Sequence, residues 1–112
     1  MSHRHLIEGN PVLVVVDIQN GDPPSAGITP IPHMPSDGSW IANATQLIQG
    51  ARDADVPVVF IQEAHRRDLI DFGRELDGVE GVHLLEGDHG TEIRPEIGMT
   101  ENDYFIKKRR YS

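Results

Sequence analysis

The chain has 112 residues, of which 38% are hydrophobic and 25% are charged, a composition typical of a globular domain. Its formal net charge of -8 argues against a general binder of nucleic acid or anionic membranes, because both attract proteins with an excess of Lys and Arg. The absence of cysteine excludes disulfides, Cys-ligated metals and any thiol nucleophile within these residues.

Strand and helix patterns alternate along the first part of the chain. Residues 12–18 (VLVVVDI) begin with an apolar run that lacks period-2 alternation, and they predict a central strand buried on both faces, as in parallel sheets covered by helices. Residues 21–39 hold five of the eight prolines and predict a long irregular loop. Apolar residues then recur at helical spacing, which predicts an amphipathic helix over residues 40–53.

Two further strands are expected in the rest of the chain. Residues 56–61 (VPVVFI) predict a second buried strand, and with the first strand and the helix they form a βαβ unit. Short helical turns are expected around residues 69–76 and 91–97, and residues 104–106 predict a third strand. The pattern indicates the α/β class with a parallel sheet.

Three strands leave one side of the first strand without a neighbour, because the connections place the second and third strands on its other side. A flat, apolar, unpaired strand edge is an aggregation site that natural proteins cover. We therefore expect a dimer partner, or a missing half of the same domain, to pair with this edge.

Polar residues follow each predicted strand at its carboxyl end. Asp17 follows the first strand, residues 62–65 follow the second, and Lys107 or Lys108 follows the third. Ligands of open parallel sheets bind outside this edge, and with strands about 4.8 Å apart a Lys side chain can reach across to Asp17. Asp17 would then accept a proton from a substrate or nucleophile; alternatively, it caps a turn or pairs with an Arg.

Four segments in this order carry a family resemblance: VLVVVDIQN, VPVVFIQEAHR, GVHLLEGDHGTEI and DYFIKKRRYS. Together they resemble the isochorismatase-like cysteine hydrolase superfamily, which includes nicotinamidase and N-carbamoylsarcosine amidase. The resemblance implies a three-layer α/β/α domain with a parallel Rossmann-like sheet. Residues 1–112 would form its N-terminal half and supply the first three strands.

The resemblance also implies a catalytic triad of Asp, Lys and Cys. The Asp matches Asp17 and the Lys matches Lys108 rather than Lys107. A glutamine near the family site matches Gln19, which is therefore expected to bind substrate. The Cys would lie beyond Ser112, on a segment that also pairs with the bare edge of the first strand. The implied activity is thiol-dependent hydrolysis of a small amide or carbamoyl C–N bond, and this chain alone would be inactive.

The residues after the second strand bear on metal binding. Nicotinamidases hold a metal with an Asp-x-His-x-x-x-His pattern, and the matching positions here are Glu63, His65 and Leu69. Because Leu cannot bind a metal, we expect no metal and no cofactor, and a substrate other than nicotinamide. His65 is expected to line the pocket or bind substrate; the alternative is a surface His.

Two other functions remain open: a non-catalytic remnant that binds a partner or dimerises through the exposed edge, and vinyl ether hydrolysis of the isochorismatase type. The expected partners are a small amide, a complementary C-terminal chain that carries the Cys, and further copies of the protein, with no nucleic acid or membrane. No apolar run approaches the roughly 18 residues of a membrane span, and MSHRHLIEGN lacks a signal-peptide core, so we expect a cytoplasmic protein.

Overall fold

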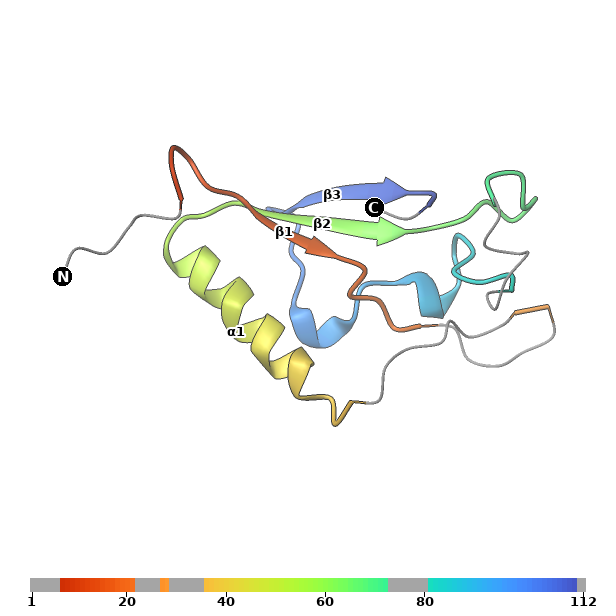
Figure 1. Cartoon of the computed structure of the whole chain (residues 1–112), viewed down its shortest axis with the longest axis horizontal. Helices are drawn as coiled ribbons and strands as arrows, with labels where there is room; N and C mark the ends of the chain where they lie inside the picture. The colour runs from red at the N-terminus through yellow and green to blue at the C-terminus, as the bar shows by residue number, and fades with distance from the viewer. Residues whose placement is uncertain (1–6, 22–26, 29–35, 73–80, 111–112) are drawn as a thin grey trace.

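The computed structural model describes residues 7–21, 27–28, 36–72 and 81–110. In chain order its elements are β1 (Leu13–Val16), α1 (Ser39–Asp53), β2 (Val58–Glu63), the 3-10 turns η2 (His89–Thr91) and η3 (Pro95–Ile97), and β3 (Tyr104–Lys108) (Figure 1). No helix in these described ranges is long and apolar enough to cross a membrane.

The three strands form one parallel sheet with β2 in the middle. Leu13 of β1 pairs with Val58, and at the other end of the sheet Glu63 of β2 pairs with Lys108 of β3. The α/β class, the parallel sheet and the placement of the second and third strands on one side of the first are therefore confirmed. Because all strands run in the same direction, their carboxyl ends meet at one edge.

The core lies between the sheet and α1, which packs below the sheet on the same side as η3 (Figure 1). Its buried members are Val15, Ile48, Val58, Phe60 and Ile97. Burial of a large apolar side chain contributes about 1.5–3 kcal/mol, so this cluster fixes α1 against β2.

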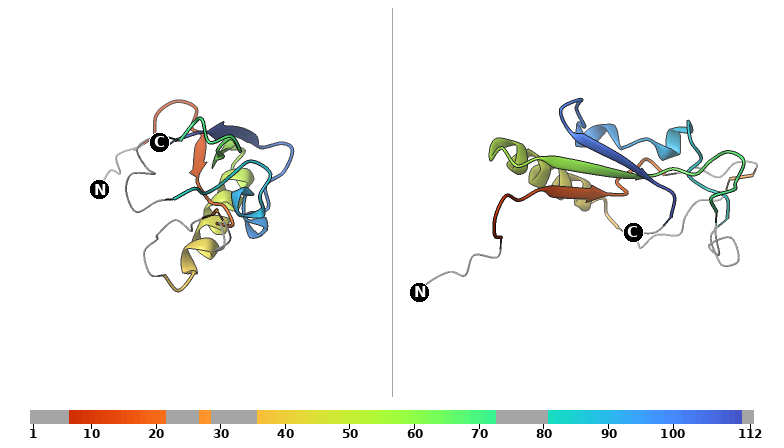
Figure 2. Two further views of the ribbon diagram at one scale, coloured as in Figure 1. Left: turned by 90° about the vertical axis from the view of Figure 1, so that its right-hand side faces the viewer. Right: turned by 90° about the horizontal axis from the view of Figure 1, so that it is seen from above.

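The opposite face of the sheet is open within the described residues. Side chains alternate between the faces of a strand, and Val14, Val16, Tyr104 and Ile106 are 48%, 40%, 63% and 53% exposed. Figure 2 (right) shows the sheet from this side, with α1 behind it. The prediction of a central first strand buried on both faces therefore does not hold here: β1 is an edge strand in which only Val15 is buried. No second helical layer lies over this face among the residues described, so the expected three layers are seen as two.

Element boundaries differ from the predictions mainly at the polar ends of strands. The helix agrees closely, but β2 and β3 each run two residues further than predicted, because Gln62 pairs with Lys107 and Glu63 with Lys108. Of the predicted turns, η3 falls within residues 91–97, and hydrogen-bonded turns occupy the start of 69–76. Residues 73–76 and most of the predicted loop at 21–39 lie outside the described residues.

Candidate active site

Asp17 and Lys108 meet at the carboxyl edge of the sheet. Lys108 Nζ donates a hydrogen bond to Asp17 Oδ2 at 3.0 Å across 91 residues of sequence. The Lys108 side chain is 15% exposed and that of Asp17 is 47% exposed. Lys107, the residue before Lys108 on β3, lies on the opposite face of the strand and is exposed. The structure thus brings together the acid and the amine expected at these strand ends, and their catalytic role stays a prediction.

Asp17 holds a backbone conformation that few residues adopt. Its φ is 63°, in the left-handed region, which is uncommon outside Gly although Asp tolerates it better than most. The Asp17 amide donates to Ile61 O at 3.0 Å, and its carbonyl accepts from Gln19 N at 3.0 Å. Strained residues of this kind cluster at functional sites; here the turn ends β1 and leaves the carboxylate at the sheet edge beside Lys108.

Gln19 follows this turn, and its side-chain amide forms hydrogen bonds with backbone atoms of two other segments. Its Nε2 donates to Glu63 O at 2.8 Å and to Thr91 O at 2.6 Å, and its Oε1 accepts from Glu63 N at 3.0 Å. Both amide hydrogens are therefore used within the protein. Substrate binding by Gln19 stays a prediction, and these bonds leave it only one acceptor position.

The segment after β2 brings two histidines together. His65 N donates to Leu84 O and Glu86 N donates to His65 O, both at 2.8 Å, which sets residues 83–86 beside His65. Leu84 has a φ of 47°, rare for a bulky side chain, and this local turn accompanies the placement of His83 next to the end of β2.

Glu63, His65 and His83 form a buried cluster at that point. Glu63 Oε2 lies 3.3 Å from His83 Nε2 and 3.6 Å from His65 Nε2, and the three side chains are 7%, 1% and 1% exposed. Burial opposes ionisation of Glu63, but the hydrogen bond from His83 and the charges of His65, His83 and Lys108 outweigh it and lower the pKa of Glu63. The cluster therefore presents a carboxylate between two imidazoles.

This donor set fits a metal ion. One ligand atom from each of the three residues lies within 4.8 Å of the others, and two imidazoles with one carboxylate are ligands that zinc binds. His65 Nε2 is also a buried nitrogen with no hydrogen-bond partner among the described residues, as expected of a lone pair available for coordination.

His83 is the residue that sequence reasoning missed. The expectation of a metal-free site depended on Leu69, which occupies the third ligand position of the sequence pattern. In the fold His83 supplies the third donor from another segment, so the Leu at position 69 no longer argues against a metal. The signal was present in GVHLLEGDHGTEI, but its distance along the chain from His65 follows no local periodicity. His65 itself lies in this cluster rather than on the surface, and a contact between His65 and substrate stays a prediction.

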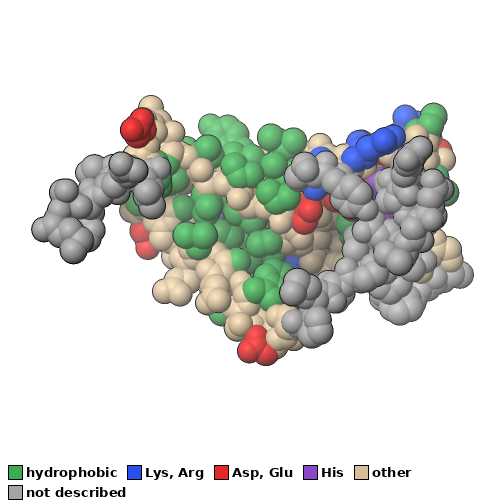
Figure 3. All heavy atoms as spheres, viewed as in Figure 1, with side chains coloured by type: hydrophobic (Ala, Val, Ile, Leu, Met, Phe, Trp, Pro, Cys, Tyr) green, Lys and Arg blue, Asp and Glu red, His purple; other side chains and the backbone are tan. Residues whose placement is uncertain are grey.

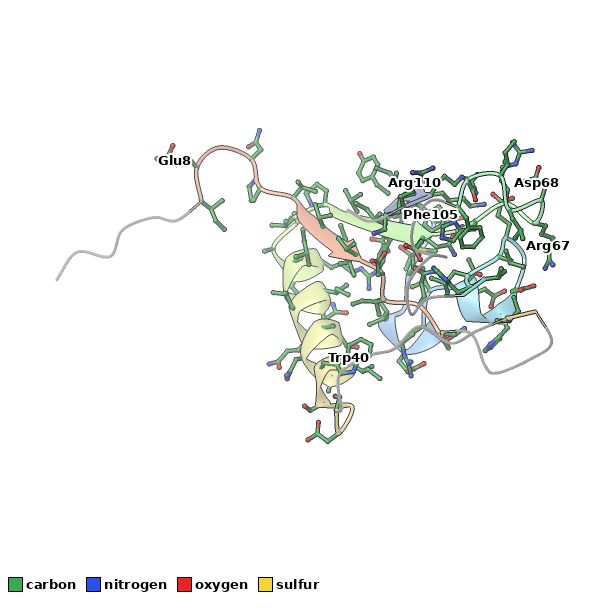
Figure 4. The ribbon with its side chains drawn as sticks, turned by 45° about the vertical axis from the view of Figure 1, so that its right-hand side comes forward. Glu8, Trp40, Arg67, Asp68, Phe105 and Arg110 are labelled. Atoms are coloured by element: carbon green, nitrogen blue, oxygen red, sulfur yellow. The ribbon has the colours of Figure 1, made fainter. Side chains whose placement is uncertain are left out.

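Figure 4 shows the end of the molecule at which the carboxyl ends of the strands lie. Arg67 and Asp68, on the segment that follows β2, are at the opposite end of the molecule from Glu8, which precedes β1. The carboxyl ends of the strands point toward the Arg67 end, so Asp17, Glu63 and Lys108 share one edge of the sheet.

Comparisons with known proteins agree with this architecture. Residues 11–112 match the model of the Isochorismatase domain family. Among solved structures, N-carbamoylsarcosine amidase from Thermoplasma acidophilum is 30% identical with a TM-score of 0.69, and the match covers 93% of this chain and 54% of that one. An isochorismatase-like hydrolase from Alkaliphilus metalliredigens is 26% identical with a TM-score of 0.67, covering 91% and 53%.

Pyrazinamidase of Pyrococcus horikoshii, solved in complex with zinc, is 25% identical with a TM-score of 0.63, and the match covers 89% of this chain and 52% of that one. The chain thus spans about half the length of the solved structures that it matches. No curated protein matches it. The family match over nearly the whole chain, together with these structural neighbours, places the chain in the isochorismatase family.

Proposed function

We propose that the protein is the N-terminal part of a hydrolase that cleaves the C–N bond of a small linear amide or carbamoyl compound. Asp17 and Lys108 would act together with a cysteine from outside these 112 residues. The observation that carries this proposal is the 3.0 Å contact between Lys108 Nζ and Asp17 Oδ2 at the carboxyl edge of the sheet. The names of two structural neighbours, N-carbamoylsarcosine amidase and pyrazinamidase, support an amide-type substrate.

The proposed reaction proceeds through a thioester. Asp17 takes the proton of the thiol, and the Lys108 ammonium favours the thiolate that forms. The thiolate attacks the carbonyl carbon, the tetrahedral intermediate collapses, and the C–N bond breaks as the leaving nitrogen receives the proton from Asp17. Water then attacks the thioester with Asp17 as base, which releases the acid and regenerates the thiol.

Glu63, His65 and His83 would hold a divalent metal beside this centre. Their donor set supports this, as does His65 Nε2, a buried nitrogen for which the described part of the chain supplies no hydrogen-bond partner. A neighbouring pyrazinamidase is described in complex with zinc. A bound divalent ion supplies Lewis-acid polarisation and orients a substrate donor atom. In this proposal the chain's own part is to present the carboxylate of Glu63 and the two imidazoles from a buried wall next to Lys108.

We further propose that a complementary polypeptide carrying the Cys covers β1. Among the described residues, three features border β1: its free edge, the open face that contains Val14 and Val16, and, on the opposite face, an apolar groove between β1 and α1. The groove is lined mainly by Ile7, Pro11, Val12, Leu13, Leu47, Ala51, Ala54 and Val56. Figure 3 shows hydrophobic side chains gathered over this region. A homo-oligomer of completed units and a cytoplasmic location stay predictions.

The test is hydrolysis by the protein purified together with any polypeptide that accompanies it. Ammonia release is measured with N-carbamoylsarcosine, pyrazinamide and nicotinamide. Asp17→Asn and Lys108→Ala should each lower kcat/KM by about 10²-fold or more, because positioned proton-transfer groups contribute about 10²–10⁴-fold. Lys107→Ala is the matched control, since Lys107 is exposed at the alternate position of β3, and it should keep the parent activity.

Alkylation with iodoacetamide separates the alternatives. This chain has no Cys, so inactivation with the label on a different polypeptide segment is the expected result. Activity that survives alkylation and is directed at a vinyl ether would replace the amide proposal with isochorismatase-type chemistry. Absence of any hydrolysis from an assembly that contains the second polypeptide would favour a binding module instead.

A further inference from the structure

Asp71 lies beside His65, on the side of the imidazole away from Glu63. Its Oδ1 is 3.3 Å from His65 Nδ1, and its Oδ2 accepts a hydrogen bond from Arg66 N at 2.9 Å. Arg109 Nε lies 3.7 Å from the same Oδ2. The Asp71 side chain is 13% exposed. The proposed reaction does not use this carboxylate, although the Arg66 amide and the Arg109 guanidinium both hold it against His65.

The carboxylate decides which ring nitrogen of His65 carries hydrogen. Asp71 Oδ2 accepts a hydrogen bond from the Arg66 amide and lies beside the Arg109 guanidinium, a setting that suits an ionised carboxylate. An ionised carboxylate only accepts hydrogen bonds, so His65 Nδ1 must be the donor. In the neutral imidazole the lone pair then lies on Nε2. This buried atom finds no hydrogen-bond partner among the described residues and lies 3.6 Å from Glu63 Oε2.

Ring packing holds the same imidazole in orientation. Phe72, the residue after Asp71, stacks on His65 with ring centroids 3.9 Å apart and an angle of 14° between the planes. His83 meets the ring edge-on, at 5.1 Å and 85°. Asp71 and Phe72 therefore act from consecutive positions, one on the hydrogen of the ring and the other on its plane.

We propose that Asp71 is a positioning residue that keeps hydrogen on His65 Nδ1 and so directs the Nε2 lone pair toward a metal shared with Glu63 and His83. This inference rests on the metal-binding part of the proposed function. Carboxylates that orient a metal-binding His in this way change metal affinity by about 10–100-fold when removed.

Two measurements on the protein as purified, with any accompanying polypeptide, test this role. Zn²⁺ affinity is measured by competition with a chromophoric chelator, and the tautomer of His65 is read from ¹⁵N chemical shifts of the metal-free protein. Asp71→Ala should weaken Zn²⁺ binding by about 10–100-fold and move hydrogen from Nδ1 toward Nε2. Asp71→Asn should retain part of both properties, because its amide oxygen still accepts a hydrogen bond.

Asp68→Ala is the matched control. Asp68 lies in the same segment but is exposed, and its carboxylate accepts from Arg66 at 2.7 Å and from the Ile70 amide at 3.2 Å rather than from His65. It should keep the parent affinity and tautomer. Should Asp71→Ala do the same, or should both variants lose Zn²⁺ equally, the positioning role is overturned. A parent protein that binds no Zn²⁺ overturns the metal assignment together with this role, while the hydrolysis assay of Asp17 and Lys108 stands separately.

Discussion

The side-chain amide of Gln19 joins two segments that are far from it in sequence. The family resemblance implies a contact between Gln19 and substrate, and in the fold the hydrogen bonds of its Nε2 go to the backbone of Glu63 and Thr91, 44 and 72 residues away. A motif specifies which residue stands at a position, but the partners of that residue depend on chain segments that only the fold brings near. For the same reason the sequence did not predict His83 as a member of the cluster, since its approach to His65 depends on pairing between residues 65 and 85.

Gln19→Ala should destabilise the protein. It removes the side-chain partner of the Glu63 amide and of the Glu63 carbonyl, and each buried group left unsatisfied costs about 1–3 kcal/mol. Thr91 O keeps the hydrogen bond that it accepts from Gln62 Nε2 at 2.7 Å. We expect the free energy of unfolding to fall by about 2 kcal/mol or more in urea denaturation.

Gln49→Ala is the control for this substitution, because Gln49 is exposed on α1 and its side-chain amide donates a hydrogen bond to Asp53 one turn away. It should change the free energy of unfolding by less than about 0.5 kcal/mol. A raised KM with unchanged stability in Gln19→Ala would instead assign Gln19 to the substrate.

At the scale of elements, the sequence patterns predicted where helix and strands lie better than which of their side chains are buried. The periodic stripe placed the helix correctly, but Ile48 is 2% exposed whereas Leu47, beside it on the same stripe, is 61% exposed. Burial depends on which elements cover each face, and a stripe contains no information on its partner. The strands likewise extend into Gln62, Glu63 and Lys108, because ladder pairing continues through polar residues.

An ion pair holds α1 to the start of β3. Arg52, in the last turn of the helix, donates to Asp103 Oδ2 at 2.6 Å and to Gly98 O at 3.0 Å. Thr100 N donates to the same carboxylate oxygen at 2.8 Å. The Asp103 side chain is only 7% exposed, so this contact is shielded from water and contributes more than a surface pair would.

The pH dependence of stability should report this contact. Burial opposes ionisation of Asp103, but the Thr100 amide and the Arg52 guanidinium outweigh it, so its pKa in the folded state lies below the usual 3.8. Its contribution is therefore present above the unfolded pKa and is lost as the pH falls through the folded pKa. Asp103→Asn should lower stability near neutral pH and make the loss of stability below about pH 4 shallower than in the parent.

Urea denaturation at a series of pH values between about 2 and 7 measures this effect. Glu101→Gln, an exposed substitution two positions earlier, is the control and should leave the parent's acid dependence in place. Parallel pH curves for the parent and Asp103→Asn would show that Asp103 is not the group responsible.

At the scale of the whole molecule, the described residues form a sheet that is covered on one face only. α1 and η3 cover one face, while the other face presents Val14, Val16, Tyr104 and Ile106. The free edge of β1 adds unpaired backbone groups to this apolar surface, a combination that leads to association when it is left uncovered. The site is on the same part of the molecule, since Asp17 follows β1 directly, and a polypeptide that pairs with β1 would reach Asp17 at its end.

The mass of the purified assembly tests whether a polypeptide covers this surface. The chain alone has a mass of 12.4 kDa, and we expect native mass spectrometry to show a larger particle, with a second, Cys-containing component under denaturing conditions. Val16→Lys should separate the components, because a charge on this apolar face opposes burial. Ile70→Lys is the matched control, since Ile70 is 71% exposed on the segment after β2 and away from β1. A single monomeric species of 12.4 kDa that stays soluble would show that the edge of β1 needs no partner, and a particle built only of 12.4 kDa chains would assign the surface to a second copy of this protein.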